Sequence, residues 1–365
     1  MGDTENMNQR STYWLAAAGL LVGMLALGIG LVAVVRAGDS STTSADGAGM
    51  SMSGNASMME HMAPAPMDGV PDAAAARGGQ LLPHTVDNGV WVFALAAKPV
   101  RWEILPGTRV TAWTYNGVVP GPEIRVPYGQ RVRFVVKNDL PDGTTVHWHG
   151  IDVPNAMDGV PGVTQEPIEP GASFTYEFDA IPAGRDSAGG TFFYHTHGPE
   201  EDRQFGLGLS GAFVIEPKEP QGYDVERTVL IQEWNLNAAT GETRPAMEME
   251  GMLPNYFTLN GKSFPATETV KVRRGERVLF RLVGAGAFTH PMHLHGTDFT
   301  VVAKDGHPLA APYKADVIQV GPGERYDIAF TFDRPGKWVF HCHIGHHLTN
   351  GGEDPGGLLM VIDVT

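Results

Sequence analysis

Eight histidines of this chain stand in four pairs, with one residue between the members of each pair. The pairs are His147/His149, His195/His197, His293/His295 and His341/His343. In a β-strand, residues i and i+2 point to the same face, roughly 6.5 Å apart, so each pair can present two imidazoles to one site. A single pair is better explained by surface or core histidines than by a metal site. Four pairs together indicate a metal cluster, although neutral imidazole suits copper, zinc, iron and nickel alike.

The only cysteine, Cys342, lies between the two histidines of the last pair. On a strand its sulfur points to the face opposite to its neighbours' rings, so it can bind a different metal ion. His347, five residues on, and His290, three residues before His293, can complete a His2Cys set. This is the ligand set of a blue-copper electron-transfer site. Structural zinc is the alternative, but zinc sites usually close with four local nitrogen and sulfur ligands, and a single cysteine supplies only one sulfur.

These motifs resemble those of the multicopper oxidases, the laccase and cuproxidase family. The family's four signatures occur in order as His147-Trp-His149-Gly, His195-Thr-His197-Gly, His290-Pro-Met-His293-Leu-His295-Gly and His341-Cys342-His343-Ile-Gly-His-His347. The resemblance covers about residues 89 to 365. It implies a type 1 copper held by His290, Cys342 and His347, and a type 2 copper held by His147 and His293. It implies a type 3 copper pair held by His149, His195, His197, His295, His341 and His343.

The resemblance also implies an activity. The family couples four one-electron oxidations of a reducing substrate to the reduction of O2 to water, with four coppers per active unit. Phenols, Cu(I), Fe(II) and Mn(II) remain open as the substrate. Because its only cysteine lies in the second half, the chain resembles the two-domain laccases that carry blue copper in the C-terminal domain. Those assemble as homotrimers, with each trinuclear cluster between domain 1 of one chain and domain 2 of the next.

Two other functions compete with this interpretation. A copper nitrite reductase shares a two-domain plan, but it places its blue-copper cysteine in the first domain, where this chain has Thr196. A non-catalytic copper-binding or storage protein would not require two electronically linked sites.

The chain departs from the family pattern near the ligands. Asp158, nine residues after His149, matches the acidic residue that supplies protons in relatives, although Asp158-Gly159 is also typical of a turn. Gly352 occupies the usual position of the axial methionine, and we expect Met360 to be a core residue. Leu348 replaces an acidic proton donor that some relatives carry. We expect surface or supporting positions for His84, His307 and His346.

Composition and periodicity define the elements that must position these ligands. With 46 glycines, 27 prolines and 18% charged residues, long helical bundles are disfavoured. Short β-type runs separated by turns favour β-sandwiches, and Gly129-Gln-Arg-Val-Arg-Phe resembles Gly275-Glu-Arg-Val-Leu-Phe as an internal repeat. We predict an all-β protein with two cupredoxin-like Greek-key sandwiches, residues 89–218 and 219–365. The predicted strands include 91–95, 131–136, 173–178, 212–216, 228–232, 277–282, 300–302, 326–332, 338–343 and 358–364.

The segment before the first sandwich has two parts. Residues 1–36 contain an uncharged apolar run from Trp14 to Val35, long enough to span ~30 Å of hydrocarbon as a helix. We predict a transmembrane anchor, with a cleaved secretory signal as the alternative, and therefore an extracytoplasmic, membrane-anchored or secreted enzyme. Residues 37–88 are predicted to be a disordered linker. This segment contains six methionines. Their thioethers either bind Cu(I) as soft ligands or have no role beyond that of the linker. They are Met50, Met52, Met58, Met59, Met62 and Met67.

The formal charge of -15 argues against nucleic-acid binding, because such a surface gains little from counterion release. It suits cationic substrates better. Met247, Met249 and Met252 alternate with Glu248 and Glu250. They could bind a soft cation, or they could form a loop with scattered apolar contacts.

Overall fold

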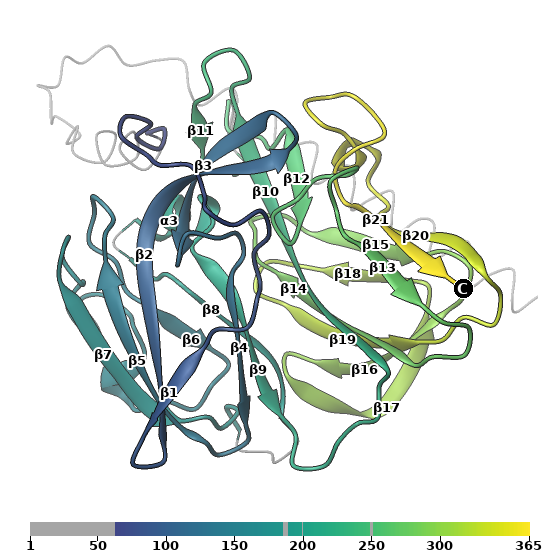
Figure 1. Cartoon of the computed structure of the whole chain (residues 1–365), viewed down its shortest axis with the longest axis horizontal. Helices are drawn as coiled ribbons and strands as arrows, with labels where there is room; N and C mark the ends of the chain where they lie inside the picture. Colours follow the sequence, from purple (N-terminus) through teal and green to yellow (C-terminus); the bar gives the residue numbers. More distant parts are fainter. Residues whose placement is uncertain (1–62, 185–188, 199, 249–250) are drawn as a thin grey trace, which may run out of the picture. The chain divides into compact units, whose positions relative to one another are not determined.

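The computed structural model describes residues 63–184, 189–198, 200–248 and 251–365 (Figure 1). The predicted membrane helix and the first part of the predicted linker lie outside these residues. Within the described residues, no helix is both long enough and apolar enough to cross a membrane. Four β-sheets account for most of the regular structure, which confirms the prediction of an all-β fold.

Strands β1 to β9, which we call the first domain, form two sheets. One sheet has the order β1-β2-β5-β7, with β3 paired to β2, and the other has the order β4-β9-β8-β6. The strands of the first sheet are β1 (His84–Asp87), β2 (Val90–Leu105), β3 (Thr108–Tyr115), β5 (Arg131–Asn138) and β7 (Ser173–Asp179). Those of the second are β4 (Gly121–Pro127), β6 (His147–His149), β8 (Gly190–His195) and β9 (Ser210–Glu216).

Alternation along β5 shows why this segment is a strand. Val132, Phe134 and Val136 are fully buried, while the residues between them face outward, as the two-residue period of a strand requires. On the inner side, the ring of Phe134 packs 4.3 Å from that of Trp148 in the opposite sheet. On the outer side, Arg133 pairs with Glu177 of β7 at 2.6 Å. One face of this sheet therefore forms the core of the first domain.

Strands β10 to β21, the second domain, repeat this plan. One sheet has the order β11-β10-β14-β19-β16-β17, with β12 on β10, and the other β13-β21-β20-β15-β18. The first contains β10 (Val225–Leu236), β11 (Thr243–Arg244), β12 (Tyr256–Leu259), β14 (Val278–Gly284), β16 (Phe299–Lys304), β17 (His307–Ala315) and β19 (Arg325–Phe330). The second contains β13 (Thr269–Val272), β15 (His290–Leu294), β18 (Val317–Val320), β20 (Gly336–Cys342) and β21 (Leu359–Val364).

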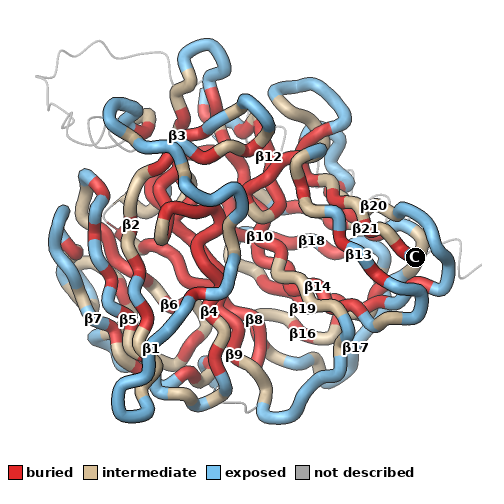
Figure 2. The backbone as a smooth tube through the Cα atoms, in the orientation of Figure 1, coloured by how far each residue is buried: buried red, intermediate tan, exposed pale blue. Residues whose placement is uncertain are grey.

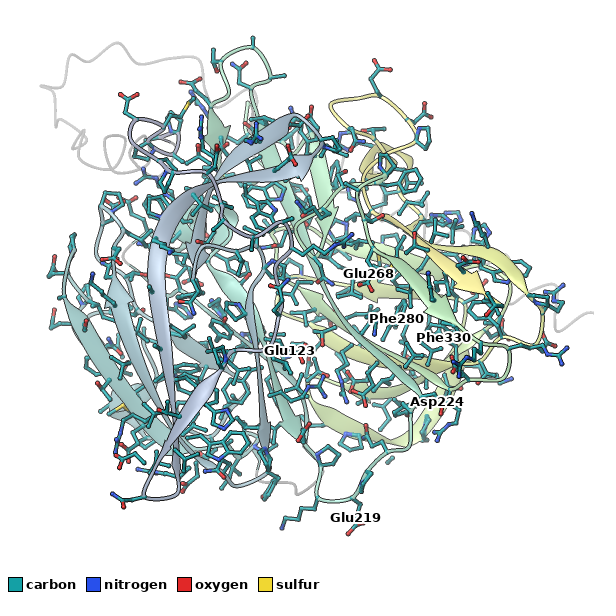
Figure 3. The ribbon with its side chains drawn as sticks, viewed as in Figure 1. Glu123, Glu219, Asp224, Glu268, Phe280 and Phe330 are labelled. Atoms are coloured by element: carbon teal, nitrogen blue, oxygen red, sulfur yellow. The ribbon has the colours of Figure 1, made fainter. Side chains whose placement is uncertain are left out.

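The internal repeat noted in the sequence corresponds to matching sheet topology. Strand β14 pairs in parallel with β10 and antiparallel with β19, as β5 pairs in parallel with β2 and antiparallel with β7. Phe280 packs edge-on against Phe330, with ring centroids 5.0 Å apart, and faces Phe340 of the other sheet (Figure 3). The two halves therefore share the same pattern of strand pairing around the repeated segment.

The two domains meet through strands that are buried along their whole length. Every residue of β8 and β14 is buried, as Figure 2 shows for the strands at the centre of the view. A polar anchor crosses the contact, because Thr191 of β8 donates a hydrogen bond of 2.6 Å to Asp327 of β19, which also binds Arg281. The connection between the domains contains the exposed Glu219 and Asp224 (Figure 3), and the predicted boundary near residue 218 falls within it.

The prediction of a disordered linker up to residue 88 is wrong for residues 63–88. Ala65 donates a backbone hydrogen bond of 2.8 Å to Thr243, and Leu82 donates one of 2.8 Å to Glu123. Strand β1 then pairs with β2. The segment is poor in apolar residues, but Ala65 and Leu82 are buried. Its backbone finds partners on strands of both domains, which composition alone does not reveal.

Candidate metal centres

A first group of histidines lies on β6 and β8. In the antiparallel pair, His147 stands directly opposite His195, and His197 follows the end of β8. The ligand atoms of these three residues lie within 4.8 Å of one another. His149 extends the group, since its Nδ1 lies 3.3 Å from Nε2 of His195. The structure thus brings together all four predicted ligands of the first domain.

A second group of histidines occupies the equivalent place on β15 and β20. His293 stands opposite His341, and together with His295 they offer ligand atoms within 4.8 Å of one another. The ring centroid of His343 lies 5.5 Å from that of His293 and 5.8 Å from that of His341, and this side chain is exposed. Three of the four predicted ligands of this domain therefore form a compact set, with His343 at its edge.

Backbone carbonyls orient four of these imidazoles. In each, Nδ1–H donates a hydrogen bond of 2.7 to 2.8 Å to a carbonyl oxygen. Such bonds fix the tautomer and turn Nε2 toward a metal ion. The pairs are His147 with Asp158, His195 with Thr196, His293 with Asp316, and His341 with Cys342.

Asp158 lies beside the first group. Its carboxylate Oδ1 is 3.4 Å from Nδ1 of His147, in addition to the carbonyl contact. It ends the short 3-10 helix η1 (Asn155–Met157), and Gly159 follows with a φ of +81°. A Cβ at residue 159 would lie 2.1 Å from the carbonyl oxygen of Val146. The turn and the functional interpretation are therefore compatible, because the turn holds Asp158 against the ligand.

Sequence reasoning missed the short helix α3 (Glu201–Gly206), which supports His197. Glu201 lies 2.6 Å from Nδ1 of His197, and this hydrogen bond raises the pKa of that imidazole. Gln204, buried on the same helix, accepts hydrogen bonds from Thr144 and Thr196. His197 lies in the irregular segment before α3 begins, so helical spacing in the sequence does not announce this contact.

Burial keeps most of the remaining imidazoles neutral. It lowers the pKa of His147, His195 and His341. It lowers the pKa of His149 to about 3, with repulsion from the nearby Arg325 adding to the effect. Neutral imidazole is the metal-binding form, so these rings are prepared to bind metal at neutral pH.

The predicted His2Cys set is assembled in the core of the second domain. Sγ of Cys342 lies 3.5 Å from Nδ1 of His347 and 3.9 Å from Nδ1 of His290. All three residues are buried, with His347 on the 3-10 helix η2 (Gly345–Leu348). Burial raises the pKa of the thiol to about 11 and lowers that of His347 to about 3. The sulfur points into the core while the neighbouring imidazoles point outward, as predicted, and two imidazoles with one thiolate fit copper.

A buried carboxylate behind this set was not predicted. Nε2–H of His290 donates to the carboxylate of Glu233, whose other oxygen accepts the backbone N–H of Ala287 at 3.1 Å. Gly286 permits this approach, since a Cβ there would lie 1.8 Å from the carboxylate. Its signal in the sequence is the polar pair Gln232-Glu233 between the apolar residues Val229–Ile231 and Trp234 of β10.

The other residues singled out in the sequence lie outside the metal groups. Met360 is buried in the core, as expected, and Gly352 has a φ of +96° with open space around it. Leu348 ends η2. Among the methionines near residue 250, Met252 is fully buried, Met247 lines a pocket, and Met249 lies outside the described residues. His84 stacks on Trp91, His346 is exposed, and His307 is half-buried on β17.

The eleven predicted ligands do not form one cluster within the described part of the chain. They form three groups, of which one belongs to the first domain and two to the second. Among the described residues, no group combines histidines of both domains.

Comparisons with known proteins agree with this geometry. Family models described as multicopper oxidase match residues 96–220 and 236–352. Multicopper oxidase MmcO of Mycobacterium tuberculosis is 32% identical over 268 residues, which are 65% of this chain and 51% of that protein. Laccase-1 of Botryotinia fuckeliana is 35% identical over 261 residues, which are 66% of this chain and 44% of that protein.

A solved structure shares the fold. The structure of Blue Copper Oxidase from Nitrosomonas europaea matches with a TM-score of 0.69 and 35% identity, covering 75% of this chain and 85% of that one. The chain spans about half the length of the curated relatives it matches. The family models cover both histidine groups and the His2Cys set, and the second model ends before the last strand, β21. This chain belongs to the multicopper oxidase family.

Proposed function

We propose that this protein oxidises a small reducing substrate in one-electron steps and reduces O2 to water. The observation that carries the proposal is the strand β20. Cys342 places its sulfur in the buried His2Cys set, and the adjacent His341 belongs to the second histidine group. An electron accepted at the His2Cys set therefore has a route of a few covalent bonds to that second group.

The ligand sets support copper at each position. The type 1 site is formed by His290, Cys342 and His347. The type 2 ligands are His147 and His293, and the other six paired histidines hold the type 3 pair. Copper bound there supplies the one-electron and O2 chemistry, and the chain supplies neutral imidazoles, a thiolate and a proton donor. Asp158, in contact with His147, is placed to deliver protons to the histidine groups.

A copper nitrite reductase is less well supported. In the first domain, Thr196 occupies the position of that enzyme's cysteine. It is buried and forms hydrogen bonds with Thr144 and Gln204. These contacts support the backbone beside His195 and leave no sulfur ligand there.

We also propose a homotrimer with the trinuclear centre between subunits. The second histidine group lies near solvent, and two exposed apolar side chains border it. Val317, opposite His293, is 37% exposed, and Ile344, next to His343, is 39% exposed. A contiguous exposed apolar patch beside a site is typical of a protein interface. Closed rotational symmetry lets domain 1 of each copy meet domain 2 of the next.

Complementation between inactive variants tests this assembly. One variant, His147→Ala with His195→Ala, loses the first group, and the other, His293→Ala with His341→Ala, loses the second. In mixed trimers, about a quarter of the interfaces combine an intact first domain with an intact second domain. We expect about that fraction of the parent's O2 consumption with 2,6-dimethoxyphenol. No recovery in mixtures refolded together, or a fully active monomer in sedimentation, would contradict the interfacial centre.

The oxidase activity itself is tested with an oxygen electrode. Consumption of O2 with four one-electron donors oxidised per O2, and without peroxide release, is the expected result for reduction to water. Localisation outside the cytoplasm with an N-terminal anchor is part of the proposal. Fractionation of cells expressing the full chain, with and without residues 1–36, tests it.

A further inference from the structure

Arg325 of the second domain is a buried cation beside the first histidine group. It begins β19 and is 4% exposed. Its guanidinium carbon lies 5.7 Å from the centroid of the Phe193 ring on β8. A Cβ at Gly150, the residue after His149, would lie 2.9 Å from a guanidinium nitrogen. The positive charge therefore reaches the first domain next to a predicted copper ligand.

The ring of Phe193 separates this charge from two predicted ligands. Phe193 stands opposite His149 in the pair of β6 and β8, and the two rings stack with centroids 4.6 Å apart. The same ring stacks on that of His195 at 4.8 Å. A phenyl ring screens a charge much less than water does, so the guanidinium acts on both imidazoles through a layer of low dielectric constant.

Neutral acceptors provide most of the hydrogen bonds of the Arg325 guanidinium. One terminal nitrogen donates to the carbonyl oxygen of Gly323 at 2.6 Å, and the other donates to that of Asp305 at 3.2 Å. The carboxylate of Asp305 lies 3.6 Å from the first nitrogen, and this side chain is 41% exposed. Nε–H has no hydrogen-bond partner among the described residues. Buried polar groups are nearly always satisfied, so an unpaired donor on a buried cation points to a ligand of opposite charge.

The other carboxylates close to Arg325 along the chain are paired with other cations. Glu324 binds Lys304 at 2.7 Å, and Asp327 binds Arg281 at 2.7 Å. The charge of Arg325 is therefore only partly compensated. A buried charge of this kind favours an anion in its surroundings.

We propose that Arg325 sets the affinity of the copper-loaded first histidine group for small inorganic anions such as azide and halides. The proposal rests on the proposed copper sites and adds a positioning residue that acts from across the domain contact. Because the two ring contacts put the guanidinium within about 10 Å of the imidazole of His149, its charge changes the affinity for a monovalent anion bound there by about tenfold at an effective dielectric constant of about 20. Loss of the charge should therefore make O2 consumption less sensitive to these anions.

Azide titration of the copper-loaded full chain, followed by the charge-transfer absorption of bound azide at fixed ionic strength, tests the proposal. Arg325→Met removes the charge and keeps an unbranched side chain, whereas Arg325→Lys retains the charge. Asp305→Asn removes the carboxylate beside the guanidinium, and asparagine tolerates the φ of +53° at this position. Lys262→Met is the matched control, because Lys262 is another buried cation of the second domain and lies 4.5 Å from the ring of Trp102 in the first.

We expect the Kd for azide to rise about tenfold in Arg325→Met, to stay within about threefold of the parent in Arg325→Lys and Lys262→Met, and to fall about twofold in Asp305→Asn. The copper content of every variant should match that of the parent. A lower free energy of unfolding with unchanged azide affinity in Arg325→Met would show a purely structural role and overturn the proposal.

The variants of Asp305 and Lys262 keep the test decisive. If Arg325→Met does not fold, unchanged azide affinity in Asp305→Asn overturns the proposal. An equal loss of affinity in Lys262→Met would also overturn it, because the effect would then belong to any buried cation at the domain contact. A parent that shows neither azide absorption nor O2 consumption would instead refute the proposed copper oxidase function.

Discussion

The contact between the two domains depends on the buried charge of Asp327. Its side chain is 5% exposed and accepts hydrogen bonds of 2.7 Å from Arg281 and 2.6 Å from Thr191. Burial raises the pKa of Asp327, against the opposing effect of Arg281. Because Thr191 lies on the strand that carries His195, this anchor also fixes the position of a metal ligand.

Asp327→Asn keeps the size of the side chain and removes its charge. Removing one partner of a buried ion pair costs about 3 to 5 kcal/mol. Arg281 retains a second carboxylate, Glu226 at 3.1 Å, so we expect a loss near 3 kcal/mol in the free energy of unfolding. With a urea m-value of about 3 kcal/mol/M for a protein of this size, the midpoint should fall by ~1 M.

Urea denaturation of the copper-free protein, at one fixed protein concentration, measures this effect. Asp333→Asn is the control, since the side chain of Asp333 is 91% exposed. We expect the control to stay within about 0.5 kcal/mol of the parent. If Asp327→Asn and Asp333→Asn shift the midpoint equally, the buried ion pair does not stabilise the domain contact and the reasoning is refuted.

Three further predictions concern the metal groups and the N-terminal segment. Asp158→Asn should reduce O2 turnover by ~100-fold or more, the usual value of a positioned proton donor, without loss of copper measured by atomic absorption; full activity would exclude the proton-delivery role. In the copper-free protein, the pKa of His347 is lowered to about 3, so below about pH 6.5 the unfolded state binds more protons at this residue than the folded state does. The contribution of neutral His347 to the free energy of unfolding is therefore fully present above that pH and decreases as the pH falls toward 3. At pH 5 this residue alone should cost ~2 kcal/mol, and urea midpoints that do not change between pH 7 and 5 would contradict it. Serine in place of the six methionines from Met50 to Met67 should weaken copper loading in cells or Cu(I) oxidation while leaving phenol turnover of preloaded enzyme unchanged, and equal copper tolerance and loading would show that these methionines are only linker.

The sequence predicted the strands whose side chains alternate. Val132, Phe134 and Val136 of β5 point inward, and the buried Cys342 lies between outward-facing histidines. In both cases the two-residue alternation of side chains along one strand is enough to predict which face of that strand is buried. His347 was expected near the sulfur because it lies five residues after Cys342, and His290 because it lies three residues before His293 of the second group.

The residues that were missed depend on contacts between distant segments. Glu233 has no motif of its own, and its role appears only when β10 packs behind His290. The ordered segment 63–88 follows from backbone partners at Arg101 and Thr243, which composition does not encode. Whether the two histidine groups meet depends on the packing of domains or subunits. Local spacing cannot specify that packing.

The copper content and visible spectrum of Cys342→Ser show whether Cys342 holds a copper of its own. We predict that the copper-loaded parent is blue with four coppers per chain, and that the variant loses the blue absorption and one copper while keeping the other three. Substrate oxidation should also be lost. Blue colour in the variant, or loss of all four coppers together, would contradict the assignment of Cys342 to a separate His2Cys site.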